Sequence, residues 1–342
     1  MNLIAKLCGI AVVMPMLAVA QVPAAYRTTA LPFDSGTLVI NNAGDVAGMV
    51  DGRVALWQRG SGLSYLTASG EYATFADMND LGQLVGASGD RPTIWQLGRQ
   101  PVSFDAGVYG GSAIAINNNG TMVAMARGLL GEEGREDDYF IYKDGQRTSL
   151  YGFFPSEIND REQIVGNLRG PGGHGAIWQD GTLHALPDDG YSWSATINDQ
   201  GWVAGGTSDG SLPIHGAIWK GGQPEVYGPG YAYGINNAGL AVGFSYDAQH
   251  AMLFYGGQTY DLNDLWDSTG WEGWSLISAE DVNNAGDIVV VAGRPGGGGE
   301  QMLLLSPVPE PANAWLLLAG LLLFGGLHRA IAGNPIAQVR TI

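Results

Sequence analysis

The stretch Ile40-Asn41-Asn42-Ala43-Gly44 decides the fold, because its pattern recurs along the whole chain. Each copy has an apolar residue, an Asn, an Asn or Asp, any residue and usually a Gly. The copies begin at Ile40, Met78, Ile116, Ile158, Ile197, Ile235 and Val282. Successive copies lie 38 to 47 residues apart, so the sequence contains seven units of about 40 residues.

Each unit has the pattern of four short strands. Asn and Gly accept positive φ, so the recurring phrase predicts a tight turn between two strands. A third strand ends in an aromatic residue in six units, as at Trp57 and Trp219, and a Gly-rich turn leads to a fourth. A Gly seven residues after the first Asn indicates close approach of neighbouring backbones. This glycine is Gly48, Gly86, Gly166, Gly205 and Gly243 in five units.

Four short strands in about 40 residues are typical of a propeller blade. The sequence therefore predicts an all-β fold, a seven-bladed β-propeller over residues 24–307. The seventh unit lacks a fourth strand, whereas residues 26–32 form a spare strand before the first unit. We expect pairing between residues 26–32 and 301–305 to close the ring and protect its edges. A β-solenoid or an open array is the alternative.

The N-terminus has the pattern of a secretion signal. Lys6 precedes an apolar run from Leu7 to Leu17, and Ala18-Val19-Ala20 fits a small-residue cleavage site. Residues 1–20 are therefore predicted to be a signal peptide that forms an apolar helix. The only cysteine, Cys8, lies within it, so the body has no disulfide framework and no thiol chemistry.

The C-terminus has three ordered features. Val308-Pro309-Glu310-Pro311 precedes an apolar run that begins near Trp315, and Arg329 follows this run. The run predicts a short transmembrane helix within residues 308–329. The basic residue then predicts a cytoplasmic tail over residues 330–342.

This order resembles the PEP-CTERM sorting signal of Gram-negative bacteria. The resemblance covers Val308 to Arg329 and implies that an exosortase recognises the tail, in hosts that usually make exopolysaccharide. It also implies a precursor anchored transiently in the inner membrane, and then a cell-surface or extracellular protein.

The repeat resembles the bacterial extracellular HAF family. The matching triplets are His174-Gly175-Ala176, His215-Gly216-Ala217 and His250-Ala251-Met252. This resemblance implies export and a propeller-like body, with no known chemistry. The three histidines hold the same repeat position, so we interpret them as structural.

The charge balance excludes nucleic acid as a partner. The formal net charge is −17, and such a surface repels phosphate backbones. The sequence also contains no HExxH motif, no paired-histidine metal spacing and no Gly-x-Ser-x-Gly elbow. We therefore predict no metal and no cofactor. The acidic run between Glu132 and Asp138 is interpreted as a solvated loop.

An aromatic-rich insert between the sixth and seventh units is the candidate ligand site. Trp266, Trp271 and Trp274 crowd this insert with acidic residues nearby, a combination suited to stacking on sugars and hydrogen bonding to them. The alternative is that the three tryptophans only pack the insert onto the blades.

Two functions follow from these patterns. The favoured one is a non-enzymatic, cell-surface protein that binds polysaccharide or another surface protein in the extracellular matrix. The alternative is a lyase or glycosidase, which needs paired carboxylates as proton donor and acceptor. Candidates for such a pair are repeat-breaking loop acids, namely Asp188, Asp189, Asp264 and Asp267.

Overall fold

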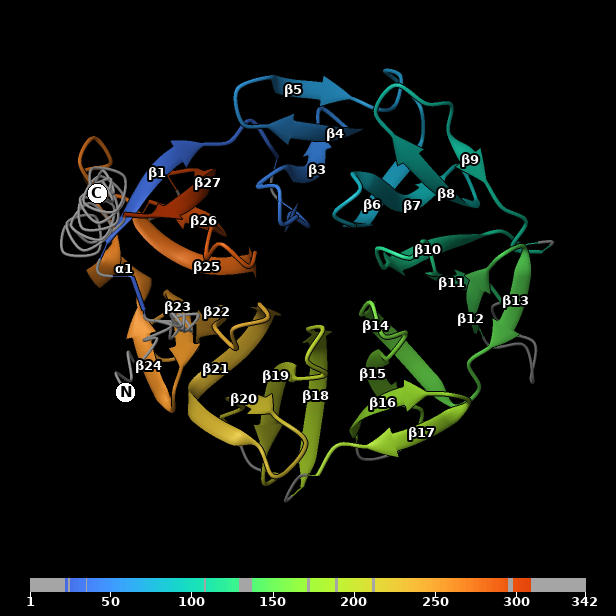
Figure 1. Cartoon of the computed structure of the whole chain (residues 1–342). Coiled ribbons are helices and arrows are strands. Elements are labelled where there is room, and N and C mark those ends of the chain that lie inside the picture. The colour runs from blue at the N-terminus through green and yellow to red at the C-terminus, as the bar shows by residue number, and fades with distance from the viewer. Residues whose placement is uncertain are drawn as a thin grey trace, which may run out of the picture.

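The computed structural model describes residues 22–23, 25–34, 36–107, 109–128, 137–170, 173–187, 190–210, 213–294 and 298–308. Antiparallel sheets surround a central axis in the manner of a propeller (Figure 1). The predicted all-β propeller arrangement is therefore confirmed. Within the described ranges, the only helix is the single turn α1 (Leu262–Leu265).

Five sheets have four strands each. They are β2 (Val39–Ile40), β3 (Val46–Val50), β4 (Arg53–Gln58) and β5 (Gly62–Tyr65); β6 (Ala73–Met78), β7 (Gln83–Ser88), β8 (Arg91–Gln96) and β9 (Val102–Ser103); β10 (Gly111–Ile116), β11 (Met122–Ala126), β12 (Asp138–Lys143) and β13 (Gln146–Ser149); β14 (Phe153–Ile158), β15 (Ile164–Leu168), β16 (Gly175–Gln179) and β17 (Thr182–Ala185); and β25 (Ser275–Val282), β26 (Ile288–Gly293) and β27 (Glu300–Pro307) with β1 (Tyr26–Ala30).

A sixth sheet has seven strands in sequence order. They are β18 (Tyr191–Ile197), β19 (Val203–Ser208), β20 (His215–Trp219), β21 (Glu225–Ile235), β22 (Ala241–Ser245), β23 (Ala251–Tyr255) and β24 (Gln258–Asp261).

The prediction of seven separate four-stranded blades was wrong. The structure has five such blades, and one seven-stranded sheet forms the rest of the wall. The reason is β21, which has eleven residues and pairs with β20 through its first part and with β22 through its last part. The chain passes through Gly228-Pro229-Gly230 without the turn that separates the other units.

The expected closure between the two ends of the body is confirmed. β1 pairs antiparallel with β27, from Tyr26 opposite Pro307 to Ala30 opposite Leu303. The two strands lie side by side in Figure 1. One further bond, from the Val308 N–H to the Ala25 carbonyl at 2.9 Å, extends the seam to the start of the sorting motif.

The first Asn of each recurring phrase links consecutive units. Its Oδ1 accepts backbone N–H groups two and four residues later, as Asn117 does from Asn119 and Thr121. In six of the seven units its Nδ2 donates to the backbone carbonyl of the next such Asn, as from Asn117 to Asn159 at 3.0 Å. These seven asparagines are 3–5% exposed, so the bonds form in a largely dry environment.

The second residue of the phrase forms a closed ring, which we call the turn ring. Each backbone N–H donates to the Oδ1 of the equivalent residue in the next unit, at 2.7–3.0 Å. The last link returns from Asn284 to Asn42, 242 residues apart. The members are Asn42, Asp80, Asn118, Asp160, Asp199, Asn237 and Asn284.

This finding corrects the interpretation of the asparagines as residues with positive φ. In the turns, the left-handed position is the final Gly, such as Gly201 at φ 79°, or Glu162 in the fourth unit. The asparagines are required because a short amide can accept and donate at once.

The repeated glycine of the second strand confirms the predicted close approach. A Cβ on Gly205 would lie 1.9 Å from the carbonyl oxygen of Trp193 in the neighbouring strand. That separation is far below any van der Waals contact, so no other residue fits without moving the backbone.

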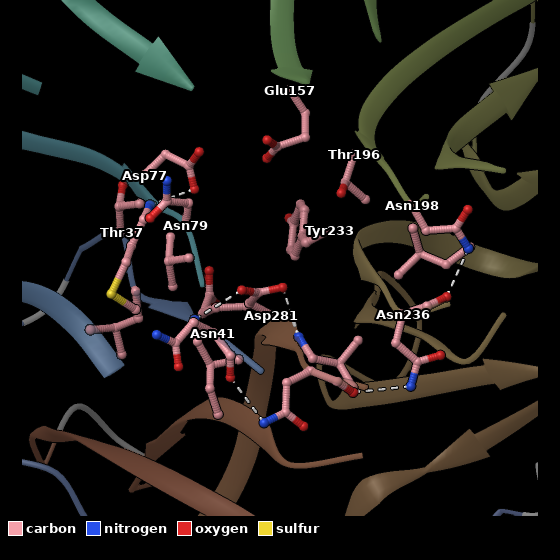
Figure 2. Close-up of a pocket in the computed structure, with 18 of the residues that line it drawn as sticks. Thr37, Asn41, Asp77, Asn79, Glu157, Thr196, Asn198, Tyr233, Asn236 and Asp281 are labelled. Carbon is pink, nitrogen blue, oxygen red and sulfur yellow. Dashed lines mark hydrogen bonds between the residues drawn. The ribbon is translucent and has the colours of Figure 1, made fainter. Parts of the chain in front are cut away.

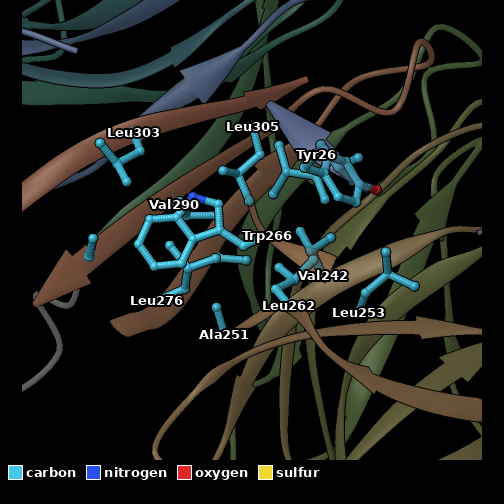
Figure 3. Packing of buried hydrophobic residues seen from close by; sticks show 14 of the residues in the cluster. Tyr26, Val242, Ala251, Leu253, Leu262, Trp266, Leu276, Val290, Leu303 and Leu305 are labelled. Carbon is cyan, nitrogen blue, oxygen red and sulfur yellow. The ribbon is translucent and has the colours of Figure 1, made fainter. Parts of the chain in front are cut away.

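The core lies between neighbouring sheets and not within any one of them. The largest cluster joins Val242 and Leu253 of one sheet to Leu276, Val290 and Leu303 of the next (Figure 3). These side chains are fully buried, so each sheet depends on its neighbours for burial of its apolar face.

The two predicted terminal helices, over residues 1–20 and 308–329, lie outside the described residues except for Val308. Within the described part of the chain, no helix has the length and apolar character to span a membrane.

Candidate functional site

The candidate site is a cavity of about 770 Å³ on the propeller axis, which we call the channel. The innermost strands and the turn ring form its wall. Figure 2 shows side chains of the innermost strands, such as Asp77 and Asp281, around this space. Each unit contributes side chains from the same few positions, so any residue that departs from the repeat changes the channel locally.

Three carboxylates occupy one repeat position in the channel wall. Asp77, Glu157 and Asp281 each stand two residues before the first Asn of their unit. The equivalent residues in the other units are Val39, Ala115, Thr196 and Gly234. The acids therefore break the repeat.

A β-bulge in the innermost strand accompanies this position. The register shifts between Phe75 and Asp77, and likewise in five other units. A bulge places an extra residue in one strand and re-aims the neighbouring side chains. Tyr233 and Glu280 are the extra residues in two of the units, and both line the channel.

Asp77 is held in place by backbone amides. Its Oδ1 accepts the N–H of Met78 at 2.7 Å, and its Oδ2 accepts the N–H of Ile116 in the next unit at 2.8 Å. The side chain is only 8% exposed. Burial raises the pKa of Asp77 to about 6, although the two backbone bonds oppose this rise.

Asp281 repeats this geometry across the junction of the two chain ends. Its Oδ1 accepts the N–H of Val282 at 2.8 Å, and its Oδ2 accepts the N–H of Ile40 at 3.0 Å. Burial raises the pKa of Asp281 to about 6 as well, with smaller contributions from Asp77 and Glu280.

Glu157 is bound differently. Its Oε1 accepts the N–H of Ile158 at 3.1 Å, and among the described residues Glu157 makes no hydrogen bond to the next unit. Burial, and then repulsion from Asp77, raises the pKa of Glu157 well above its ordinary value. Figure 2 shows Glu157 and Tyr233 projecting into the space between the strands.

The channel is acidic throughout. Among the described residues, eight carboxylates and no Lys, Arg or His line it. The acids are Asp77, Asp80, Glu157, Asp160, Asp199, Glu280, Asp281 and Glu300. Burial also raises the pKa of Glu280. Such a wall favours a ligand that carries positive charge or donates hydrogen bonds.

The described acids do not form a metal-binding group of three. No three His, Cys, Asp or Glu side chains in the described part of the chain are grouped so that they could hold one metal ion. The arrangement therefore differs from a calcium loop, in which several oxygens meet at one point.

The structure brings the three predicted tryptophans together away from this channel. The ring centroids of Trp266 and Trp271 are 6.4 Å apart, and those of Trp271 and Trp274 are 5.6 Å apart. Trp266 is 8% exposed, and its Nε1 donates to Thr28 Oγ1 at 2.6 Å. Trp271 and Trp274 pack half-buried on the same core cluster, and sugar binding by them stays a prediction.

Of the four candidate catalytic acids, only Asp264 and Asp267 lie in the described part of the chain. Asp264 lies in α1, and Asp267 is an exposed residue whose pKa is lowered by hydrogen bonds from Thr269. Asp188 and Asp189 lie outside the described residues, as do Pro309, Glu310 and Pro311 of the sorting motif. Val308 lies at the end of the seam between β1 and β27.

Two of the repeat histidines make bonds to neighbouring strands. His215 contacts the Tyr227 carbonyl at 3.1 Å, and His250 contacts the Asp261 carboxylate at 2.6 Å. Both bonds agree with the structural interpretation.

Sequence reasoning missed Asp77, Glu157 and Asp281. Repeat-breaking acids are expected in variable loops, whereas these three acids lie inside β6, β14 and β25. Aligning the seven units on the first Asn and examining the position two residues earlier would have found them, because that column alternates between apolar, small and acidic residues.

Comparisons with known proteins support the fold alone. No family model and no curated protein matches the chain. A chain in the crystal structure of the mitotic checkpoint complex has a TM-score of 0.50 at 13% identity, and the match covers 91% of this chain and 100% of that chain.

Two more distant structures also align. The β-propeller domain of the Trilobed protease from Pyrococcus furiosus has a TM-score of 0.40 at 11% identity, covering 79% of this chain and 78% of that chain. A gluconolactonase from Xanthomonas campestris has a TM-score of 0.38 at 14% identity, covering 82% and 98%. At these TM-scores and identities, the two likenesses carry no argument about this chain.

Proposed function

We propose that this chain is an exported, cell-surface protein that acts by binding, and that its ligand occupies the channel. An exosortase-type enzyme sorts it through residues 308–329, and its setting is the extracellular matrix or exopolysaccharide. The propeller body, from Tyr26 to Pro307, fits between the two predicted terminal segments, which supports this assignment.

The single observation that carries the binding role is the set of repeat-breaking carboxylates in the channel. Buried acids are costly unless something compensates their charge. Asp77, Glu157 and Asp281 stand at one position that other units fill with Val, Ala, Thr or Gly, so the fold itself does not require a carboxylate there. Ligand binding explains why such costly residues are present.

A ligand panel read by thermal unfolding tests this role. The panel contains linear amines, calcium, neutral oligosaccharides and organic anions. We compare the wild type with the triple variant Asp77→Asn/Glu157→Gln/Asp281→Asn, and use Asp51→Asn, an exposed acid, as the matched control.

At least one class is expected to raise the unfolding temperature of the wild type and of the control, but not that of the triple variant. The proposed function fails if no class stabilises the wild type, or if the triple variant responds equally.

A second candidate, a carbohydrate-active hydrolase or lyase, has one observation in its favour. Glu157 has a raised pKa, makes no hydrogen bond to the next unit among the described residues, and lies near two carboxylates that are fixed by backbone amides. A proton donor beside a fixed carboxylate is the pattern of acid–base cleavage of sugars.

Incubating the protein with polysaccharides tests this candidate. Release of reducing or unsaturated ends by the wild type, and its loss in Glu157→Gln, would favour the enzyme over the binding protein. Equal product with Glu157→Gln, or none with the wild type, would reject it.

A further inference from the structure

We infer that the ligand of the channel is a linear aliphatic polyamine, a flexible chain with ammonium groups separated by methylene segments. This inference rests on the proposed function and specifies its ligand class.

The first argument is an uncompensated buried charge. Asp77 is 8% exposed, and its hydrogen bonds come only from neutral backbone amides. No basic side chain among the described residues lines the channel with it. Charged side chains are rarely buried this deeply without an opposite charge. A bound cation would supply the missing charge.

The second argument is the spacing of the acids along the axis. Asp80, Asp160 and Asp199 lie in the turn ring, and Asp77 and Glu157 lie three residues earlier in their strands. Three residues span at most roughly 10 Å. Glu300 also lines the channel, and it lies opposite Gly293, which pairs with Ser275 at the far end of β25 from Asp281, so a further carboxylate lies beyond these two tiers.

A single small ion would contact only a few of these acids. One metal ion needs several oxygen ligands at about 2–2.5 Å, and the described acids are not grouped in that way. A molecule with several cationic groups can instead place one group at each tier.

The third argument is the apolar surface between the acids. Half-buried Ile114 and Ile277 line the channel, and the Tyr233 ring is 37% exposed within it. Methylene segments gain from contact with such surface. The face of Tyr233, next to Glu280, also attracts an ammonium group. A neutral sugar would leave the buried charges uncompensated.

Proton release should accompany binding. A cation beside the carboxylates favours their ionised form, so affinity should fall as the pH is lowered through about 6, where Asp77 and Asp281 become protonated. Affinity should also fall with salt concentration, as for any charge-driven association.

Isothermal titration calorimetry with spermine tests the inference on the full chain. Butylamine, calcium chloride and a neutral trisaccharide serve as comparison ligands. Asp281→Asn and Glu157→Gln are the test variants, and Asp51→Asn is the control. Circular dichroism and melting temperature of each variant establish that it is folded.

Spermine is expected to bind the wild type and the control equally, and each test variant about tenfold more weakly, the effect of losing roughly 1.4 kcal/mol of pairing. Butylamine and calcium should bind far more weakly than spermine. Absence of spermine binding, or equal binding by the folded test variants, overturns the inference.

The outcomes separate this inference from the proposed function. If calcium or the neutral trisaccharide binds in a manner that depends on Glu157, and spermine does not, the channel is a ligand site and only the polyamine is wrong. If spermine does not bind and no class of the thermal-unfolding panel stabilises the wild type, both proposals fail.

Discussion

Replacing Asp77 with Asn should change how the stability of the protein depends on pH. The folded state raises the pKa of this carboxyl to about 6, from an ordinary value of 3.8. The folded protein therefore holds the proton more tightly than the unfolded chain does. The resulting stability is fully present below about pH 4 and is lost as the pH rises through about 6.

The magnitude follows from this difference. Above pH 6, ionised Asp77 costs the folded state about 3 kcal/mol, at about 1.4 kcal/mol for each pKa unit. Because part of this cost is already present at about pH 4.5, the change between about pH 4.5 and pH 7.5 is about 2 kcal/mol. The side chain is 8% exposed, so solvent screening reduces this value little.

Asn cannot ionise, so Asp77→Asn should lose this share of the pH dependence. The Asn side chain has one acceptor oxygen, so it keeps one of the two backbone hydrogen bonds and loses the other. This loss lowers the free energy of unfolding by about 1 kcal/mol at every pH. The free energy of unfolding is measured by urea titration at several pH values between these limits. Asp51→Asn, which removes an exposed charge, is the control.

The wild type and the control should lose stability toward pH 7.5 by about 2 kcal/mol more than Asp77→Asn does. Parallel pH profiles for the wild type and Asp77→Asn, within about 0.5 kcal/mol, would refute the reasoning. They would mean that the channel solvates the ionised carboxylate as well as water does.

Three further predictions concern the backbone contacts, the turns and the tail. Gly205→Ala should destabilise the fold by at least about 3 kcal/mol, because its Cβ would overlap the carbonyl oxygen of Trp193, whereas Gly222→Ala, with open space around it, should change the urea midpoint little. Asn117→Ala should cost roughly 3 kcal/mol of unfolding free energy, since it removes three buried hydrogen bonds; a loss below about 1 kcal/mol in the same titration would count against the role assigned to the turns. Deleting residues 309–342 should leave the melting temperature of the body unchanged but abolish cell-surface retention, as judged by fractionation of a tagged protein; unchanged retention would contradict the sorting assignment.

The recurring phrase at Ile40 was enough to predict the propeller, because seven similar turns imply repeated sheets around an axis. The seventh unit lacks a fourth strand after Leu305, and a spare strand begins at Tyr26. This complementarity predicted that the spare strand completes the seventh unit. Both inferences depend on local pattern and on the need to cover exposed strand edges.

Two other features of the fold could not be predicted from the repeat pattern. The continuous strand β21 arises where a turn is replaced by Gly228-Pro229-Gly230, and strand continuity there depends on pairing with residues on both sides. The role of the asparagines was also missed, because their partners lie 38 to 47 residues away in the sequence, or 242 residues away at the closure.

The channel acids were missed for a similar reason. Alternation along a strand assigns side chains to one face or the other, but a bulge breaks this alternation. The register shift between Phe75 and Asp77 cannot be read from the sequence. The sequence alone therefore does not indicate that Asp77 faces the axis.

The turn ring also determines how the protein unfolds. Every link points in the same rotational sense, from one unit to the following one, and the last link meets the first. An open array of repeats has terminal units that fray, because each has one uncovered face. Here no unit is terminal, so there is no free end from which unfolding can begin. Opening at any point breaks a link on both sides of the displaced unit, which favours loss of the whole circle as one cooperative event.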